Sequence, residues 1–384
     1  MKYSVWLQLC LGVGNSNIKL ALETFGSAKA VFLSNKTERK NSGIFTQSEL
    51  KRLNNSNLEE AESIVKKCEE NNIEIITFGS KKYPFCLSVI ENPPAVLYIK
   101  GNFPDFDNTP SIAIVGPRKV SEFGKKAAFS LGYRLARSGM TVVSGGALGT
   151  DTYAHAGALK AEGKTALVMA CGILSDYLKE NASLRESVSK KGCLISEYPP
   201  ETNATRYSFP IRNRIISALS LGTVVVEAGE KSGALITAKH AYEQGRDVFV
   251  IPHSPKDKGF EGSNALLRDG AKPLLDTSDI FNEYIVRFPD KINIERAFSG
   301  KILPEIRKKT AIKSETQEKI EKNFNETLSK EAKIVYNYLD KQKFIPEDLI
   351  GTGLNSQQLI SALTELEMEF LIKALPGGMY EKCN

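Results

Sequence analysis

The chain has 384 residues, of which 41% are hydrophobic and 25% charged, so it is not globally disordered and should form two or three domains. Its 51 Lys and Arg against 45 Asp and Glu give a net charge of +6, which is compatible with a polyanionic partner without requiring one. Six widely spaced cysteines without a C-x-x-C pair predict reduced thiols, and three histidines without ligand spacing predict no metal site. No apolar run is long enough to span a bilayer, and the apolar start lacks a signal-cleavage site, so we expect a cytoplasmic protein.

Residues 1–54 predict a small N-terminal helical domain. The turn Leu11-Gly-Val-Gly14 separates an apolar first helix from a second segment, Ile18–Phe25. Two short helices around a glycine turn are typical of a helix-hairpin-helix, which can present backbone N–H groups to phosphates. A helical packing domain without DNA contact explains the same pattern, so both interpretations stay open.

Residues 55–290 predict a Rossmann-like α/β domain. Its short apolar runs are uninterrupted rather than alternating, which is typical of parallel strands buried on both faces. The runs cover residues 73–78, 112–115, 141–143, 165–170, 193–196, 223–227 and 248–251. Helical stretches alternate with these runs, which indicates a doubly wound, mainly parallel sheet.

The C-terminal part of the chain predicts a linker and a third domain. Residues 291–326 lose the apolar periodicity and are rich in charge, so we expect a linker there. Residues 327–384 then predict a helix, a helix-turn-helix and a hairpin, in the order of a winged helix. Because the segment 355–364 has no Lys or Arg, we do not expect this domain to act as a sequence-specific duplex regulator.

Loops after the predicted strands carry the candidate functional residues, since open parallel sheets bind ligands beyond the carboxyl ends of their strands. One loop runs from Gly116 through Arg118 to Ser121, which can cap the next helix. Two others are Ser144–Asp151, which has three glycines, and Glu230–Thr237, which has a serine–glycine turn. Such turns before helices offer N–H groups to anions, although tight strand-to-helix turns need glycine in any case.

A further loop has the most specific pattern, Arg206-Tyr-Ser-Phe209-Pro210-Ile-Arg212-Asn213-Arg214. We expect Pro210 at the first helical position, which would put Arg212 and Arg214 in the first turn, where cations oppose the helix dipole. A bound anion would offset that cost. Phe209 beside Arg206 suits the stacking of a base next to neutralised phosphates.

Other interpretations of these loops are weighed against the nucleic-acid one. The aromatic ring can instead pack under the helix start while the arginines pair with Asp151 or Glu227. The chain has neither a Walker A sequence nor G-x-G-x-x-G after its first strand, which disfavours a nucleotide-dependent enzyme. Ser144 or Ser232 would need a histidine base to act as a nucleophile, and we expect His155 to be a packing or capping residue. Several anion sites along one sheet edge favour a strand of nucleic acid over a single nucleotide.

Most of the chain resembles the DNA-processing protein A (DprA/Smf) family. The matching blocks are Tyr83-Pro84 and residues 92–102, 113–118, 142–145, 151–158, 196–199, 209–216, 225–228, 232–238, 245–249 and 262–264. The resemblance implies a non-enzymatic, cofactor-free protein that binds and protects single-stranded DNA and loads a RecA-type recombinase onto it during natural transformation. It also implies a homodimer formed through the Rossmann-like domain.

The resemblance implies a DNA-binding set of cations, glycines and one aromatic residue. The set is Arg118, Gly145, Gly146, Arg206, Phe209, Arg212, Arg214 and Lys239. Two departures from the family pattern affect it: Leu148 stands where an arginine is common, and residues 172–181 lack a proline and carry a shifted Asp176. The alternative function is a nucleotide phosphoribohydrolase of the same sheet type, but its G-G-x-G-T-x-x-E motif is not matched around Gly145–Asp151.

Overall fold

The structure is a computed structural model that describes residues 1–254, 256–299, 329–339, 343–368, 371–375 and 379–382. The chain divides into two compact units, Met1–Ile302 and Leu303–Asn384. Each unit is described by itself. The segment 300–328, which includes most of the predicted linker, lies outside the described residues, as does the predicted hairpin turn 376–378.

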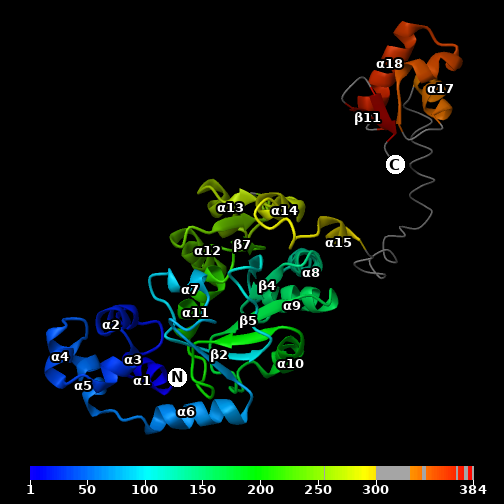
Figure 1. Cartoon of the computed structure of the whole chain (residues 1–384). Helices are drawn as coiled ribbons and strands as arrows, with labels where there is room; N and C mark the ends of the chain where they lie inside the picture. Colours follow the sequence, from blue (N-terminus) through cyan, green and yellow to red (C-terminus); the bar gives the residue numbers. More distant parts are fainter. Residues whose placement is uncertain (255, 300–328, 340–342, 369–370, 376–378, 383–384) are drawn as a thin grey trace. The chain divides into compact units, whose positions relative to one another are not determined.

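The first unit begins with a group of helices, as the sequence predicts (Figure 1). They are α1 (Lys2–Leu11), α2 (Asn17–Phe25), α3 (Ala28–Leu33), α4 (Lys36–Asn41), α5 (Gln47–Asn55) and α6 (Glu59–Glu70). Asn35 with Glu38, and Thr46 with Glu49, form capping boxes that fix the starts of α4 and α5. The buried Trp6 lies in the apolar core that these helices share with the neighbouring sheet.

The described part of this unit contains a nine-stranded, mainly parallel sheet in the order β1-β2-β6-β5-β4-β3-β7-β8-β9. The strands are β1 (Glu74–Thr77), β2 (Val96–Gly101), β3 (Ser111–Val115), β4 (Thr141–Ser144), β5 (Thr165–Met169), β6 (Cys193–Ser196), β7 (Gly222–Val225), β8 (Asp247–Val250) and β9 (Lys272–Pro273). Pairs from β6 to β9 are parallel, whereas β1–β2 and β2–β6 are antiparallel. The strand predicted over 73–78 therefore runs in the same direction as β6, and the reversed strand is β2, which lies between them.

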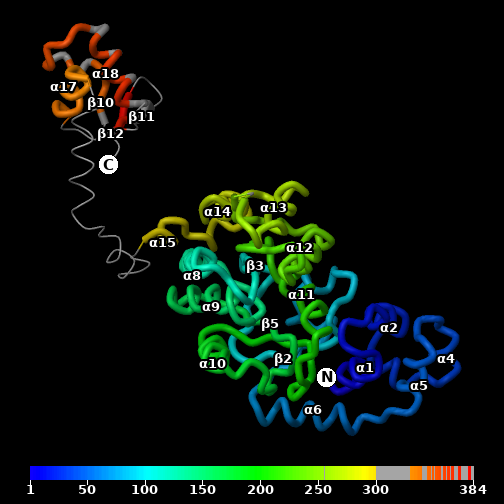
Figure 2. The backbone as a smooth tube through the Cα atoms, turned by 180° about the vertical axis from the view of Figure 1, so that it is seen from behind, coloured from blue at the N-terminus to red at the C-terminus, as the bar shows by residue number. Residues whose placement is uncertain are grey.

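Helices cover both faces of the sheet (Figures 1 and 2). One face packs on α8 (Glu122–Arg137), α9 (Thr150–Lys160) and α10 (Ala182–Lys191), and the other on α11 (Ser208–Ala218) and α12 (Gly233–Glu243). Shorter helices complete the unit: α7 (Phe85–Ser88), η1 (Lys179–Asn181), α13 (Glu261–Arg268), α14 (Ser278–Tyr284) and α15 (Ile294–Phe298). This arrangement is the doubly wound Rossmann-like architecture that the alternating pattern predicts.

The second unit is a small α/β body with its own core. It comprises α17 (Lys330–Tyr338), β10 (Lys343–Phe344), η3 (Pro346–Thr352), α18 (Ser356–Met368), β11 (Ile372–Leu375) and β12 (Met379–Lys382). Its strands pair antiparallel in the order β10-β12-β11. Ser329 caps α17 by accepting from the Ala332 N–H, and Leu366 is buried in the core.

Three further features concern the described residues. None of their helices is both long and apolar enough to cross a lipid bilayer. The five described cysteines are free thiols. No cluster of three or more His, Cys, Asp or Glu among the described residues has a metal-binding arrangement.

Candidate nucleic-acid interface

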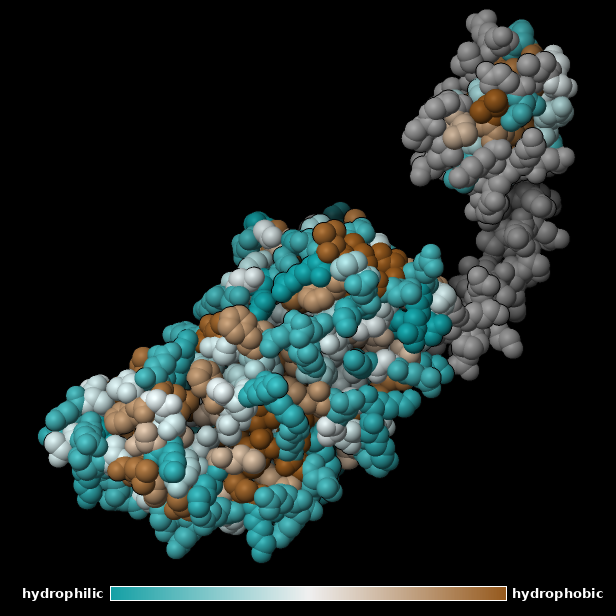
Figure 3. Space-filling model, in the orientation of Figure 1, coloured by the Kyte–Doolittle hydropathy of each residue, from teal (hydrophilic) through white to brown (hydrophobic). Residues whose placement is uncertain are grey.

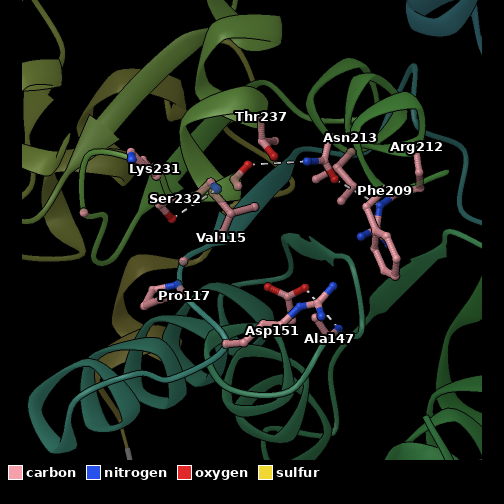
Figure 4. Close-up of a pocket in the computed structure, with 16 residues that line it drawn as sticks. Val115, Pro117, Ala147, Asp151, Phe209, Arg212, Asn213, Lys231, Ser232 and Thr237 are labelled. Atoms are coloured by element: carbon pink, nitrogen blue, oxygen red, sulfur yellow. Dashed lines mark hydrogen bonds between the residues drawn. The ribbon is translucent and has the colours of Figure 1, made fainter. Parts of the chain in front are cut away.

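A cleft lies where the strand order of the sheet reverses. β4 and β7 flank β3, and the carboxyl ends of β3 and β7 open onto a cavity of about 570 Å³. The lining side chains come from the loops after β3, β4 and β7 and from the starts of α9, α11 and α12, and they face a common space (Figure 4). They are Val115–Arg118, Ala147, Asp151, Phe209, Arg212, Asn213, Ile216, Gly229, Lys231–Ala234 and Thr237. Open α/β sheets bind their ligands at this position.

The rim of the cleft carries an arginine stacked on an aromatic ring. The guanidinium carbon of Arg118 lies 4.8 Å from the centroid of the Phe209 ring. Tyr177 also packs against Phe209, with ring centroids 5.6 Å apart. Because Arg118 is exposed and Phe209 is half-buried, the pair presents a cation to solvent beside an anchored ring.

The start of α11 differs from the prediction. The helix begins at Ser208 with Tyr207 as its N-cap residue, so Pro210 is the third helical residue rather than the first. Proline is tolerated there because N–H groups of the first turn have no intrahelical acceptor. Arg212 and Arg214 consequently lie beyond the first turn, and the expected opposition to the helix dipole does not arise.

Arg212 forms part of the buried floor of the cleft. Its Nη1 donates to the carbonyl oxygen of Gly145 at 2.7 Å and also to the carbonyl oxygen of Val168. Its Nε donates to Asn213 Oδ1 at 3.2 Å. Arg212 therefore ties the loop after β4 to the end of β5, so its first role is to hold the cleft in shape.

Asp151 faces this buried arginine across the floor. Burial raises the pKa of the Asp151 carboxyl, although the charge of Arg212 opposes that rise, and burial lowers the pKa of Arg212. Asp151 Oδ2 also accepts from the Ala147 N–H at 3.2 Å. The alternative prediction was that an arginine of this helix pairs with Asp151. Arg212 is that arginine, and its interaction with Asp151 is electrostatic.

Arg214 lies outside the cleft lining and is buried against Glu197. Its Nη2 donates to both carboxylate oxygens of Glu197 at 2.8 Å, and the two side chains are 7% and 1% exposed. Glu227, the other acid considered for these arginines, instead accepts from the N–H of Ser121 at 3.1 Å, at the N-cap of α8. The burial of Arg214 contradicts a direct DNA contact by this residue.

The same glutamate connects the N-terminal helices to α11. Glu197 Oε1 accepts from the Gly14 N–H at 3.2 Å, and the Glu197 carbonyl oxygen accepts from Gln8 Nε2 at 2.9 Å. A Cβ at Gly14, where φ is +74°, would come within 2.7 Å of Ile211 Cγ2. The glycine turn of the predicted helix-hairpin-helix is therefore packed against α11 at Gly14, whose N–H group already has an acceptor. These contacts favour the packing interpretation of the N-terminal helices.

Gly145 and Gly146 form the turn that leads from β4 towards α9. Gly146 has φ +71°, and a Cβ there would meet Leu167 at 2.7 Å. A Cβ at Gly145 would lie 2.6 Å from Arg212 Nη2. Packing alone requires both glycines. Leu148, where a cation was expected, is 40% exposed and does not belong to the cleft lining.

Arg206 and Lys239 also lie outside the cleft lining. Arg206 is exposed and stacks on the ring of its neighbour Tyr207 at 4.6 Å. Lys239 projects from α12 and forms an exposed ion pair with Glu243 at 3.6 Å. These two cations can approach a strand only beyond the cleft itself.

Two residues near the cleft were absent from the predicted set. Lys231 is exposed and lines the cleft from the loop after β7. The serine–glycine turn in 230–237 predicted an anion loop there, and Lys231 is the one lysine of that segment. Tyr177 belongs to the altered segment 172–181, and its contact with Phe209 is non-local, so no sequence signal indicated it.

Structural roles are found for both Ser144, the last residue of β4, and His155. The Ser144 hydroxyl donates to the carbonyl oxygen of Ile114 at 2.7 Å. His155 is fully buried, with Nδ1 at 2.7 Å from the hydroxyl of Thr165, and burial lowers its pKa to about 3. The prediction that His155 is a packing residue is confirmed.

The fold and sequence match known proteins across most of the first unit. The family model described as DNA recombination-mediator protein A matches residues 74–285. DNA processing protein DprA of Bacillus subtilis is 44% identical over 214 residues, which cover 56% of this chain and 72% of the relative. Protein Smf of Escherichia coli is 32% identical over 313 residues, which cover 81% of this chain and 78% of the relative.

Two solved structures are similar as well. DNA processing protein A from Streptococcus pneumoniae superposes with a TM-score of 0.66 at 30% identity, covering 74% of this chain and 98% of the other. DNA processing protein A from Helicobacter pylori, whose structure concerns single-stranded DNA binding, has a TM-score of 0.51 at 28% identity and covers 56% and 97%. The family comprises DNA-processing recombination mediators and not enzymes. With the model match over more than half of the chain and the Escherichia coli relative over most of it, this chain belongs to the DNA recombination-mediator protein A family.

Proposed function

We propose that the chain binds single-stranded DNA in the cleft at the carboxyl ends of β3 and β7. The observation that carries this proposal is the stacking of the exposed Arg118 guanidinium on Phe209. A cation beside an aromatic ring can neutralise a phosphate while the ring stacks on a base, and neither contact depends on base identity. The relative from Helicobacter pylori, which is studied for its binding of single-stranded DNA, supports the same ligand.

The residues of the proposed site divide by exposure. Arg118 and Lys231 are exposed cations at the cleft and would contact phosphates. Phe209 would stack on a base, and Gly145 and Gly146, which are buried, would shape the cleft by letting the loop after β4 pack on Arg212 and Leu167. Arg212 would act mainly as a positioning residue.

The other three predicted residues would support the site or contact DNA outside the cleft. Arg214 would support α11 from below through its ion pair with Glu197. Arg206 and Lys239 would meet nucleotides outside the cleft, since both are exposed.

The cellular role follows the family. We propose that the bound strand is incoming DNA during natural transformation, that the protein protects it in the cytoplasm, and that it helps to load a RecA-type recombinase. The second unit has the element order of a winged helix, with α17, the η3–α18 pair and the β11–β12 hairpin in sequence. We propose that this unit makes protein contacts or weak DNA contacts.

A homodimer through the Rossmann-like domain is part of the same proposal. Leu275 and Val286, on either side of α14, are 81% and 87% exposed. Figure 3 displays an apolar patch over the region of α14. Exposed apolar patches mark association surfaces. Leu275→Asp should therefore turn a dimer into a monomer in light scattering of the full chain, and an unchanged mass would contradict this surface.

The test of DNA binding is a fluorescence anisotropy titration of labelled oligo-dT with the full chain at two salt concentrations. Wild type should bind tightly with a steep salt dependence. Phe209→Ala should weaken binding about tenfold or more, whereas Phe85→Ala, an exposed phenylalanine on α7 outside the cleft lining, should not. Loss in both variants, or in neither, would place the site elsewhere. Absence of binding at low salt would contradict the proposed function and direct attention to release of ribose 5-phosphate from AMP, the alternative enzyme activity.

A further inference from the structure

Three aromatic rings gather at the start of α8 and on the loop after β8, and we call this group the aromatic shelf: Phe123, His253 and Phe260. The His253 and Phe260 rings are stacked, with centroids 4.0 Å apart and an interplanar angle of 16°. Phe123 meets His253 edge-on at 5.8 Å and is 55% exposed. His253 and Phe260 are partly exposed, so the shelf is open to solvent rather than part of the core. None of the three residues lines the cleft.

The shelf is held on the sheet by fixed contacts. His253 Nε2 donates to the carbonyl oxygen of Val226, directly after β7, at 3.0 Å. Phe123 is the second residue of α8, whose N-cap Ser121 donates its hydroxyl and N–H hydrogens to Glu227. Both elements of the shelf are therefore anchored to the carboxyl end of β7. Rings held in this way can stack on a ligand with little loss of side-chain entropy.

Two loops lead from the cleft to the shelf. Gly116–Arg118 line the cleft, and the same loop reaches Phe123 five residues after Arg118. Gly229 also lines the cleft, and a Cβ on it would stand 3.5 Å from the carbonyl oxygen of Gly259, next to Phe260. The shelf is thus continuous with the cleft surface on the side of β7 and β8.

The charges around the shelf favour an anionic ligand. Lys119, Lys256 and Lys258 are exposed on its two loops. Among the acids there, Glu122 pairs with Lys125, whereas Asp257 and Glu261 form no described ion pair and Glu261 accepts only from the Gly259 N–H, at 3.0 Å. The three lysines exceed these two carboxylates by one positive charge, which suits a phosphate backbone.

We propose that the aromatic shelf is a second contact for single-stranded DNA, where bases of nucleotides that leave the cleft stack on Phe123, His253 and Phe260. The proposal rests on the proposed function of the cleft. It predicts that the bound strand extends from the Arg118–Phe209 pair along the loop after β3, so that affinity rises with strand length until the shelf is occupied. The lysines hold the backbone, and the rings make the contact tolerant of sequence.

The experiment compares two lengths of oligo-dT, about 5 and about 15 nucleotides, bound to the full chain in anisotropy titrations. The double variant Phe123→Ala/Phe260→Ala should bind the long strand about tenfold more weakly and the short strand as wild type does. Phe85→Ala is the matched control and should bind both as wild type does. Phe123→Tyr/Phe260→Tyr should restore long-strand binding, because it keeps both rings, whereas Phe123→Leu/Phe260→Leu should not.

Each outcome decides between the cleft and the shelf. Unchanged long-strand binding by the alanine and leucine variants would overturn the shelf while leaving the cleft intact. Equal weakening on both lengths would also overturn it, since the effect would then come through the cleft. A wild type that binds neither strand would contradict the proposed function itself, and the shelf with it. An affinity of the shelf for protein alone would appear as unchanged DNA binding in all variants.

Discussion

The exposed rim and the buried floor of the cleft use arginine for different purposes. At the rim, Arg118 stacks on Phe209 and keeps its charge in solvent. On the floor and beneath it, Arg212 donates to backbone carbonyl oxygens and Arg214 is enclosed by Glu197. A cation in a DNA-binding motif can therefore be needed to build the site without touching DNA. Changes on the two levels should differ in kind, because buried changes alter folding and rim changes alter binding.

The largest effect is expected for Glu197→Ala. Removal of this carboxylate leaves the buried Arg214 charge unpaired and frees the N–H group of Gly14, which should cost about 3–5 kcal/mol of unfolding free energy. Urea denaturation of the full chain measures it. Glu243→Ala, which breaks the exposed pair with Lys239, is the control and should cost no more than about 1 kcal/mol. Similar costs for the two variants would contradict a buried ion pair between Arg214 and Glu197.

The unfolding free energy should also depend on pH, through the buried His155. Its pKa falls from 6.5 in the unfolded chain to about 3 in the folded one, so below pH 6.5 only the unfolded state takes up the proton. Stability is thus fully present above pH 6.5 and is lost as pH falls towards 3, by about 1.4 kcal/mol per unit. Between pH 7 and pH 5 wild type should lose about 2 kcal/mol more than His155→Gln in urea denaturation. A wild-type slope in His155→Gln would contradict the assignment.

Two variants at the rim should separate the contribution of base stacking to DNA binding from that of phosphate neutralisation. Phe209→Ala should weaken oligo-dT binding by about 1–3 kcal/mol without changing the salt slope, because it removes a ring and no charge. Arg118→Ala should lower the magnitude of the log–log salt slope by about 0.7, the value for one phosphate contact to a single strand. Anisotropy titrations at four salt concentrations give both quantities. Equal slope changes in the two variants would argue against this division of roles.

The sheet could be predicted largely because its strands are buried on both faces. Uninterrupted apolar runs located the strands from β3 to β8, and the alternation with helices gave the parallel, doubly wound order. The strand β2 was missed, and it is the strand that runs opposite to the others, so the two antiparallel pairs that it forms were not predicted. The predicted start of α11 was wrong because it placed Pro210 at the first helical position, whereas a proline fits any position of the first turn.

The sequence allowed the location of the site to be predicted, but not which of its residues are buried. Glycine turns and cations after strands indicated the correct edge, and they included Arg118 from the loop after β3 and Phe209 from the start of α11, which stack on each other. The partner of Arg214 was not predictable, since Glu197 belongs to another loop and only the fold brings the two together. Burial separates floor from rim, and a run of Arg-x-Arg does not encode which arginine faces inwards.

The smallest effects concern two exposed lysines, and they test where the rim ends. Lys231 lines the cleft, whereas Lys239 is paired with Glu243 on α12 outside it. Lys231→Ala should therefore reduce the salt slope by about 0.7, and Lys239→Ala should change it by less, with long oligo-dT as the ligand. Both variants should keep the unfolding free energy within about 0.5 kcal/mol of wild type, because both side chains are exposed. A larger slope change for Lys239→Ala would mean that the strand leaves the cleft along α12, and it would extend the rim in that direction.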